Sequence, residues 1–191
     1  MIVAILALQG AYQEHAQVLE RLQVPFIELR QKKDLNQHFD ALILPGGEST
    51  VQGKLLKELD MFDILKQKIE EGLPVLATCA GLILLAEELS NDENQYFQTL
   101  PVKVKRNAYG RQLGSFVRET DMKLIGKIQA RFIRGPYIES VKPNVHILAT
   151  IDDHIVAVQY QNQLAMAFHP ELSHDDRIHQ YFIQIVKGFI S

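Results

Sequence analysis

The only cysteine of the chain lies in a setting typical of a nucleophile. Cys79 follows the apolar residues 74–77 and precedes the small residues Ala80 and Gly81, a pattern that predicts a sharp turn from a buried strand into a helix. Such a turn places the sulfur at a helix N-terminus, where the dipole and free N–H groups favour a thiolate. The N–H of Ala80 could then stabilise an oxyanion. Because a lone cysteine is often a buried structural residue, Cys79 alone does not decide between the two interpretations.

A histidine much later in the chain could act as the base. His169 follows the apolar residues 164–168 and precedes Pro170 and Glu171. A cysteine nucleophile needs a base, usually a histidine that a third group orients. In extended backbone, residues i and i+2 project to the same side, so Glu171 could hold the imidazole of His169. The same short pattern also occurs at ordinary strand ends.

A metal site is the competing interpretation of this region. His169, Glu171, His174, Asp175 and His179 bring imidazoles and carboxylates together in the sequence. Their spacing matches no zinc signature, and acidic residues at the start of a helix are explained by capping. We therefore predict no metal and no cofactor.

A glycine-rich turn supplies a third candidate element. Gly46 and Gly47 follow the apolar residues 41–44, and Ser49 or Thr50 could cap a helix after them. Paired glycines let the backbone approach a ligand closely, so the N–H of Gly47 could be a second oxyanion donor opposite Ala80. The alternative is a plain strand-to-helix turn. The spacing of a phosphate-binding loop is absent.

The elements that must position these residues alternate between strand and helix in the first half. We expect strands at 2–8, 26–29, 41–44 and 75–78, and helices at 12–22, 50–59, 61–71 and from 80 to about 89. This alternation predicts an α/β fold with a mostly parallel central sheet and helices on both faces. The second half predicts added antiparallel strands at 102–105, 113–117, 129–133, 146–151, 155–160 and 164–168, then a helix at about 175–190. Ile178, Phe182, Ile185 and Phe189 should form its buried face.

Composition limits the classes of function. The 191 residues suit a single domain, 1–191, and 47% of them are hydrophobic. A net charge of −3 without a basic run argues against nucleic acid, and no apolar run is long enough to span a membrane. The single cysteine excludes an intrachain disulfide and fits a reducing compartment, so we predict a cytoplasmic protein.

Together, the Pro-Gly-Gly turn, the cysteine after a strand and the downstream His-Pro-Glu resemble the class I, triad-type glutamine amidotransferases. The chain is most similar to those that serve as glutaminase subunits of pyridoxal 5′-phosphate synthases. The blocks that carry this resemblance follow one another in family order across nearly the whole chain: 8–11 with Glu14 and His15, 44–50, 78–81, 106–112, 132–136 and 169–172. Three positions depart from the usual family residues: Ala77 for Gly, Tyr109 for Phe and Gly135 for Ala.

The resemblance implies a flavodoxin-like three-layer sandwich, with Cys79 as nucleophile, His169 as base and Glu171 as its orienting group. It implies that L-glutamine contacts Gly47, Glu48, Ser49, Arg106, Ile133 and Arg134. A guanidinium suits the α-carboxylate of glutamine, and Glu48 suits its ammonium. The implied partner is a barrel-shaped synthase subunit, joined in a hetero-oligomeric complex, that uses the ammonia to build pyridoxal 5′-phosphate.

Other interpretations remain open at this point. The resemblance makes residues 9–11 and the helix after them, with Glu14 and His15, candidates for the docking face, although His15 could simply face solvent. A triad amidotransferase serving another synthase is one rival, which the blocks 106–112 and 132–136 disfavour. A catalytically silent regulatory domain is a second rival, which intact Cys79, His169 and Glu171 disfavour.

Overall fold

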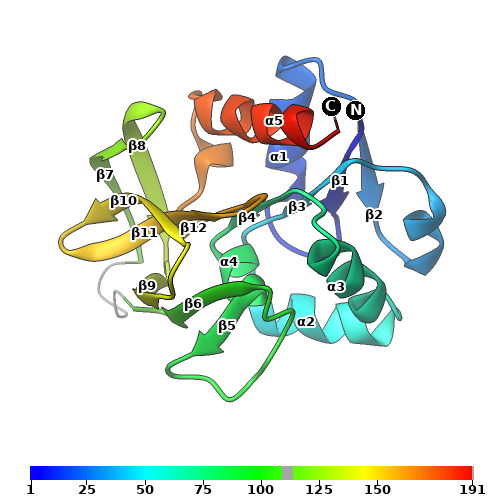
Figure 1. Ribbon diagram of the computed structural model, residues 1–191, viewed down its shortest axis with the longest axis horizontal. Coiled ribbons are helices and arrows are strands. Elements are labelled where there is room, and N and C mark those ends of the chain that lie inside the picture. The colour runs from blue at the N-terminus through cyan, green and yellow to red at the C-terminus, as the bar shows by residue number, and fades with distance from the viewer. Residues whose placement is uncertain (109–113, 191) are drawn as a thin grey trace.

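A run of parallel strands forms the half of the sheet that carries the cysteine. In the computed structural model, which describes residues 1–108 and 114–190, these strands lie in the order β2, β1, β3, β4 and β12 (Figure 1). Four of them are buried along their whole length, which explains their nearly unbroken apolar sequences. Their bounds are Val3–Leu6 for β1, Phe26–Leu29 for β2, Ala41–Leu44 for β3, Val75–Thr78 for β4 and Gln163–Met166 for β12.

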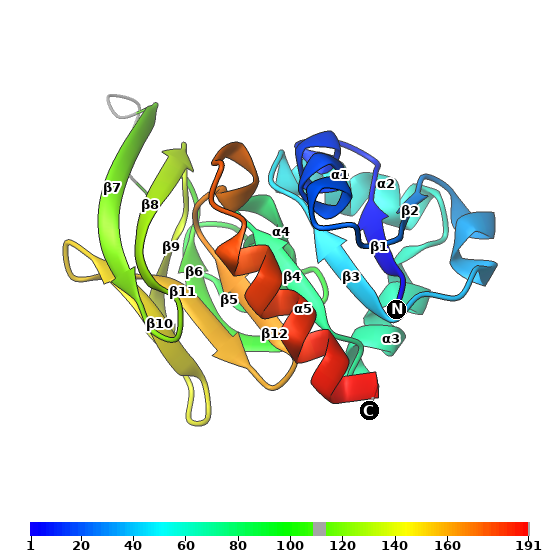
Figure 2. The ribbon, with the colours of Figure 1, turned by 90° about the horizontal axis from the view of Figure 1, so that it is seen from above.

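Helices cover both faces of this parallel region. Helices α1 and α5 lie together on one face, and α2, α3 and the short α4 lie on the other (Figure 1 and Figure 2). The three layers confirm the predicted α/β sandwich. The helices span Tyr12–Arg21 (α1), Ser49–Glu58 (α2), Phe62–Glu70 (α3), Ala80–Leu85 (α4) and Arg177–Ile190 (α5), with 3₁₀ turns at Lys32–Asn36 (η1) and Pro170–Leu172 (η2).

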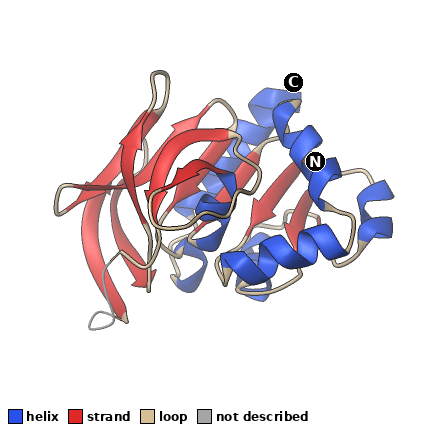
Figure 3. Ribbon diagram, turned by 90° about the horizontal axis from the view of Figure 1, so that it is seen from below, coloured by secondary structure: helices blue, strands red, loops and turns tan. Residues whose placement is uncertain are grey.

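Antiparallel pairing continues the sheet beyond β12. Strands β11, β9 and β6 follow in that order, β5 pairs in parallel with β6, and β10 pairs with β11. A separate two-stranded sheet, β7 with β8, lies beside β10, and Figure 3 shows this strand-rich region to one side of the helices. The bounds are Ala86–Leu89 (β5), Leu100–Lys105 (β6), Ser115–Met122 (β7), Gly126–Ile133 (β8), Tyr137–Val141 (β9), His146–Ile151 (β10) and His154–Tyr160 (β11).

The structure corrects several predicted elements. The helix expected from Ala80 to about 89 ends at Leu85, and the next four residues form β5. Pairing of β5 with β6 outweighs the helical preference of its Ala, Glu and Leu residues. Strand β9 and turn η1 were not predicted. Residues 109–113, which include Tyr109 and the predicted start of a strand at Leu113, lie outside the described part of the chain.

The buried face of α5 differs from the predicted one. Ile178 and Phe182 are buried as expected, but Phe189 is 46% exposed. His179 and Ile183 are buried instead, so the helix turns an imidazole toward α1. The spacing of apolar residues predicted the location of the helix correctly, but it did not predict that the polar residue His179 is buried.

One cluster of buried apolar side chains extends from Val3 in β1 to Val186 in α5. It includes residues of both the parallel and the antiparallel regions, so these two regions share one core. Among the described residues, no helix combines the length and apolarity that crossing a membrane requires.

Candidate active site

Cys79 occupies a sharp turn between β4 and α4. Its backbone has φ 47° and ψ −99°, a conformation that side-chain-bearing residues rarely adopt. The N–H of Cys79 donates to the carbonyl of Met166 in β12, at 2.8 Å, which anchors the turn to the sheet. A Cβ on Gly81 would lie 2.2 Å from the carbonyl oxygen of Leu44, so α4 packs here only with glycine. The thiol therefore lies at the carboxyl edge of the parallel strands, in a strained turn built for it.

His169 and Glu171 meet directly beside this turn. The Nδ1 atom of His169 is 2.6 Å from Oε1 of Glu171, and both side chains are buried. Their proximity agrees with the prediction, but the predicted extended backbone is wrong because Pro170–Leu172 is a 3₁₀ turn. The backbone N–H of His169 also donates to the carbonyl of Arg131 in β8, at 2.8 Å. The imidazole is thus held from its own turn and from the neighbouring sheet.

The electrostatic setting of His169 favours its protonated form. Burial alone would lower the pKa of this imidazole, since it disfavours charge. A hydrogen bond that the ring donates to Cys79, together with the hydrogen bond to Glu171 and the negative charge of that carboxylate, outweighs burial and raises the pKa of His169 to about 10. An imidazolium next to the sulfur is suited to stabilise a thiolate.

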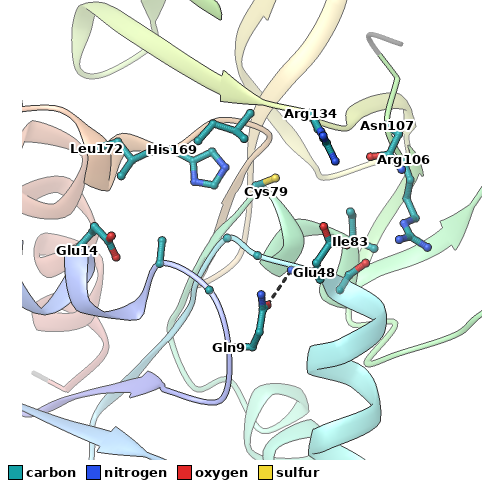
Figure 4. Close-up of a pocket in the computed structure, with 16 residues that line it drawn as sticks. Gln9, Glu14, Glu48, Cys79, Ile83, Arg106, Asn107, Arg134, His169 and Leu172 are labelled. Atoms are coloured by element: carbon teal, nitrogen blue, oxygen red, sulfur yellow. Dashed lines mark hydrogen bonds between the residues drawn. The ribbon is translucent and has the colours of Figure 1, made fainter. Parts of the chain in front are cut away.

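The glycine turn at Gly46 and Gly47 packs closely against the imidazole of His169. A Cβ on Gly46 would lie 2.2 Å from Cε1 of His169, so only glycine allows this approach. The N–H of Gly46 donates to Oγ1 of Thr78 at 3.0 Å, and its carbonyl accepts from the N–H of Ala11 at 2.9 Å. The side chain of Gln9 accepts a hydrogen bond from the N–H of Glu48 at 2.8 Å (Figure 4). Residues 9–11 therefore hold the turn in place.

The cap of α2 differs from the prediction. Glu48 precedes the first residue of α2, and no side-chain hydrogen bond caps this helix end. Capping by Ser49 or Thr50 was therefore wrong. Ser49 is instead buried in the first helical turn, where it faces the cavity.

A cavity of about 380 Å³ opens over Cys79. Figure 4 shows the sulfur of Cys79 and the ring of His169 together at this cavity, with Arg106 and Arg134 on the side away from Glu14. The structure brings most of the predicted site residues to its wall: Gly47, Glu48, Ser49, Cys79, Arg106, Ile133, Arg134 and His169. Ala80 and Glu171 are buried behind the wall.

The two arginines at the cavity differ in their partners. The guanidinium of Arg106 is paired with the carboxylate of Asp92, and its backbone is held by Asn91. Arg134 has a positive φ of 44°, and its N–H donates to the carbonyl of Gly114. Within residues 1–108 and 114–190, no carboxylate forms an ion pair with Arg134. The charge of Arg134 is therefore available to an anionic ligand.

Comparison with known proteins identifies the family. The SNO glutamine amidotransferase family matches residues 5–188. The chain belongs to this family. It is 60% identical to a protein of Desulfitobacterium hafniense named pyridoxal 5′-phosphate synthase subunit PdxT, over 98% of this chain and 94% of that relative. A protein of the same name from Haemophilus influenzae is 54% identical over 98% and 99% of the two chains.

A solved structure is similar over its whole length. The crystal structure of a glutamine amidotransferase superposes with a TM-score of 0.92 at 39% identity, covering 98% of this chain and 100% of that one. The chain is thus an enzyme of the glutamine amidotransferase class, and Cys79 and His169 line the cavity described above, with Glu171 buried behind the imidazole.

This amidotransferase also has a buried histidine that the sequence did not reveal. His15 is fully buried, so both earlier interpretations, a docking residue and a solvent-facing residue, are wrong. Nδ1 of His15 is 2.9 Å from Nε2 of His179, and its Nε2 is 3.3 Å from Oγ1 of Thr78. The spacing of His15 from Val18 and Leu19, three and four residues on, was the available sign that it shares their buried face.

The residues of the metal interpretation do not converge on one point in the amidotransferase. The carboxylate of Asp175 binds the guanidinium of Arg177, His169 binds Glu171, and His179 binds His15. In the part of the chain that the structure describes, no group of three or more His, Cys, Asp or Glu side chains is arranged to hold a metal ion.

Proposed function

We propose that this glutaminase hydrolyses L-glutamine to L-glutamate and ammonia through a triad of Cys79, His169 and Glu171. One observation carries the proposal: the thiol in the strained turn contacts an imidazole whose far nitrogen lies 2.6 Å from a buried carboxylate. This arrangement supplies a nucleophile and a proton carrier at one cavity, with an orienting group buried behind the proton carrier.

The reaction follows from these positions. The Cys79 thiolate attacks the carboxamide carbon of glutamine, and the N–H groups of Gly47 and Ala80 stabilise the oxyanion. His169 protonates the leaving ammonia, and the tetrahedral intermediate collapses to a γ-glutamyl thioester. His169 then takes a proton from water, which attacks the thioester and releases glutamate and the thiolate. Glu171 keeps the imidazole oriented and stabilises its positive charge.

The cavity wall offers groups for the rest of the substrate. Arg134, which lacks a carboxylate partner among the described residues, would bind the α-carboxylate. The exposed carboxylate of Glu48 would accept from the α-ammonium. Arg106 would support this side of the cavity together with Asp92. Ser49 and Ile133 would make the remaining contacts to the bound glutamine.

The fate of the ammonia points to a partner. Free ammonia becomes mostly protonated in water near neutral pH and loses its nucleophilicity, so direct transfer is chemically useful. Because the relatives are named subunits of pyridoxal 5′-phosphate synthase, we assign the ammonia to a barrel-shaped synthase subunit in a hetero-oligomeric complex. The negative net charge supports a role without nucleic acid, and the single free thiol supports a cytoplasmic location.

The test is the rate of glutamate release from glutamine, with and without the matching synthase subunit. We expect release that the synthase subunit strongly stimulates. Equal rates in both conditions would keep the glutaminase and refute activation by the partner. No release in either condition would refute the proposal and favour a catalytically silent domain.

A further inference from the structure

A chain of buried polar side chains runs from α5 to the triad. His179 and His15 are both fully buried, and their rings meet through nitrogens 2.9 Å apart. The other nitrogen of His15, Nε2, lies 3.3 Å from Oγ1 of Thr78 and 3.6 Å from Oε2 of Glu171. Because α1 and α5 cover this edge of the sheet, the histidines lie behind the triad and outside the cavity wall.

The two carboxylate oxygens of Glu171 have different surroundings. Oε1 lies 2.6 Å from Nδ1 of His169. Oε2 is buried and, among the described residues, has no partner within ordinary hydrogen-bond distance. A buried carboxylate oxygen without a donor is costly. The nearby Nε2 of His15 is the group placed to compensate for this cost.

The position of the protons follows from the charge of Glu171. If Nε2 of His15 carried a lone pair, it would point at a carboxylate and repel it. With a proton on Nε2, the N–H faces both Oε2 and the hydroxyl oxygen of Thr78. Nδ1 of His15 is then an acceptor and receives the N–H of His179 Nε2.

Both histidines are held neutral, as this assignment requires. Burial lowers the pKa of His15 well below its usual value, and unfavourable electrostatic interaction with the imidazoles of His179 and His169 lowers it further. Burial likewise lowers the pKa of His179 to about 4, against the opposing effect of Asp176. Neither ring therefore competes with His169 for the catalytic proton.

We propose that His15 is a positioning residue for the triad, whose Nε2–H holds the free oxygen of Glu171 so that the other oxygen stays on His169. His179 fixes the tautomer of His15 that can donate. The inference rests on the proposed function and deepens it, because it concerns how Glu171 is kept oriented toward His169 in the same triad.

The test compares two replacements of His15 in the full chain, assayed with the synthase subunit. His15→Gln can place an amide N–H near the position of Nε2, whereas His15→Leu fills a similar space without a donor. We expect His15→Leu to lower kcat about tenfold with KM within about twofold, and His15→Gln to stay within about threefold of wild type. The alkaline limit of the kcat–pH profile should move to lower pH in His15→Leu only, because a poorly held Glu171 stabilises the His169 imidazolium less.

The same replacement made in a chain that already lacks the Glu171 carboxylate distinguishes a positioning role of His15 from a general structural role. In a Glu171→Ala chain, His15→Leu should cause no further loss of kcat beyond about twofold, since the group it holds is gone. Equal fold losses in the two backgrounds, or equal kcat for the Gln and Leu variants, would overturn the proposal. If wild type itself released no glutamate, the proposed function would fail first, so the two failures are distinct.

His179 provides a second route if His15→Leu does not fold, as circular dichroism would show. His179→Leu removes the donor that fixes the tautomer of His15, whereas His179→Gln keeps an N–H near the same place. We expect a lower kcat for the Leu variant and near wild-type kcat for the Gln variant. Equal kcat in the two folded variants would refute the proposed proton arrangement.

Discussion

The two sides of the cavity are built differently. On one side, the parallel sheet and its helices bury Cys79, His169 and Glu171 to between 5% and 7% exposure. On the other side, Ile133 at the end of β8 is 41% exposed, and Arg134 follows it in a loop. The reacting groups are held by the core, whereas Arg134, which would bind the α-carboxylate of the substrate, comes from an exposed segment.

This contrast separates two kinds of effect. A buried, packed group is held in one geometry before substrate arrives, so its loss should lower kcat. An exposed arginine acts mainly through affinity for the bound substrate, so its loss should raise KM. The following changes test whether the division holds.

Cys79→Ala should have the largest effect. Without the nucleophile we expect glutamate release to fall about 10⁴-fold or more, while the dissociation constant for glutamine stays within about threefold because the binding side is intact. Release is measured with the synthase subunit, and binding by titration calorimetry. Residual activity within tenfold of wild type would show that the chemistry does not depend on this thiol.

Gly46→Ala should come next, because its Cβ would lie 2.2 Å from the imidazole of His169. Displacing the ring from Glu171 should lower kcat by about 10²-fold or more. Gly188→Ala is the matched control, since a Cβ there meets no described atom within 4 Å. Similar kcat values for the two variants would mean that the glycine turn does not need this close approach.

Glu171→Gln should lower kcat about 10²-fold and change its pH dependence. Glu171 and Cys79 raise the pKa of His169 to about 10, so the imidazolium, and with it activity, should persist until pH rises toward that value. Removing the carboxylate charge lowers this pKa, so activity should begin to fall at lower pH. An unchanged alkaline limit would remove Glu171 from the triad.

Arg134→Gln should have the smallest effect of the four and a different kind of effect. Losing a charge-assisted contact to the α-carboxylate should raise KM about tenfold while kcat stays within about threefold. Arg118→Gln, at an exposed arginine of β7, is the control and should change neither. A fall in kcat with constant KM would break the division between the two sides.

The same contrast explains how far the sequence could predict the structure. Strands β1, β3 and β4 were placed within a few residues because burial on both faces makes their sequences nearly all apolar. Cys79 and His169 were found because each follows a buried strand, β4 and β12, and Glu171 was found because it lies two residues after His169. Strand β5 was mistaken for helix because only its pairing with β6, which no local pattern encodes, makes it a strand.

Contacts between segments that are distant in the sequence also could not be predicted from local patterns. The burial of His15 depends on α5, which begins more than 150 residues later, so a pattern confined to α1 could not place it beside Thr78 and Glu171. The pairing of Arg106 with Asp92 also needs the folded loop between β5 and β6. Candidate site residues on buried strands can thus be proposed from sequence, whereas their supporting partners require the fold.

The backbone of Cys79 has a consequence for how this enzyme can be improved. Its φ of 47° and ψ of −99° would cost glycine little, so a chain optimised for stability alone would carry glycine there. The conformational strain, of the order of 1–3 kcal/mol, is retained because it presents the sulfur. Stability screens of variant libraries that omit an activity readout should therefore enrich Cys79→Gly, and would select proteins that fold better and catalyse nothing.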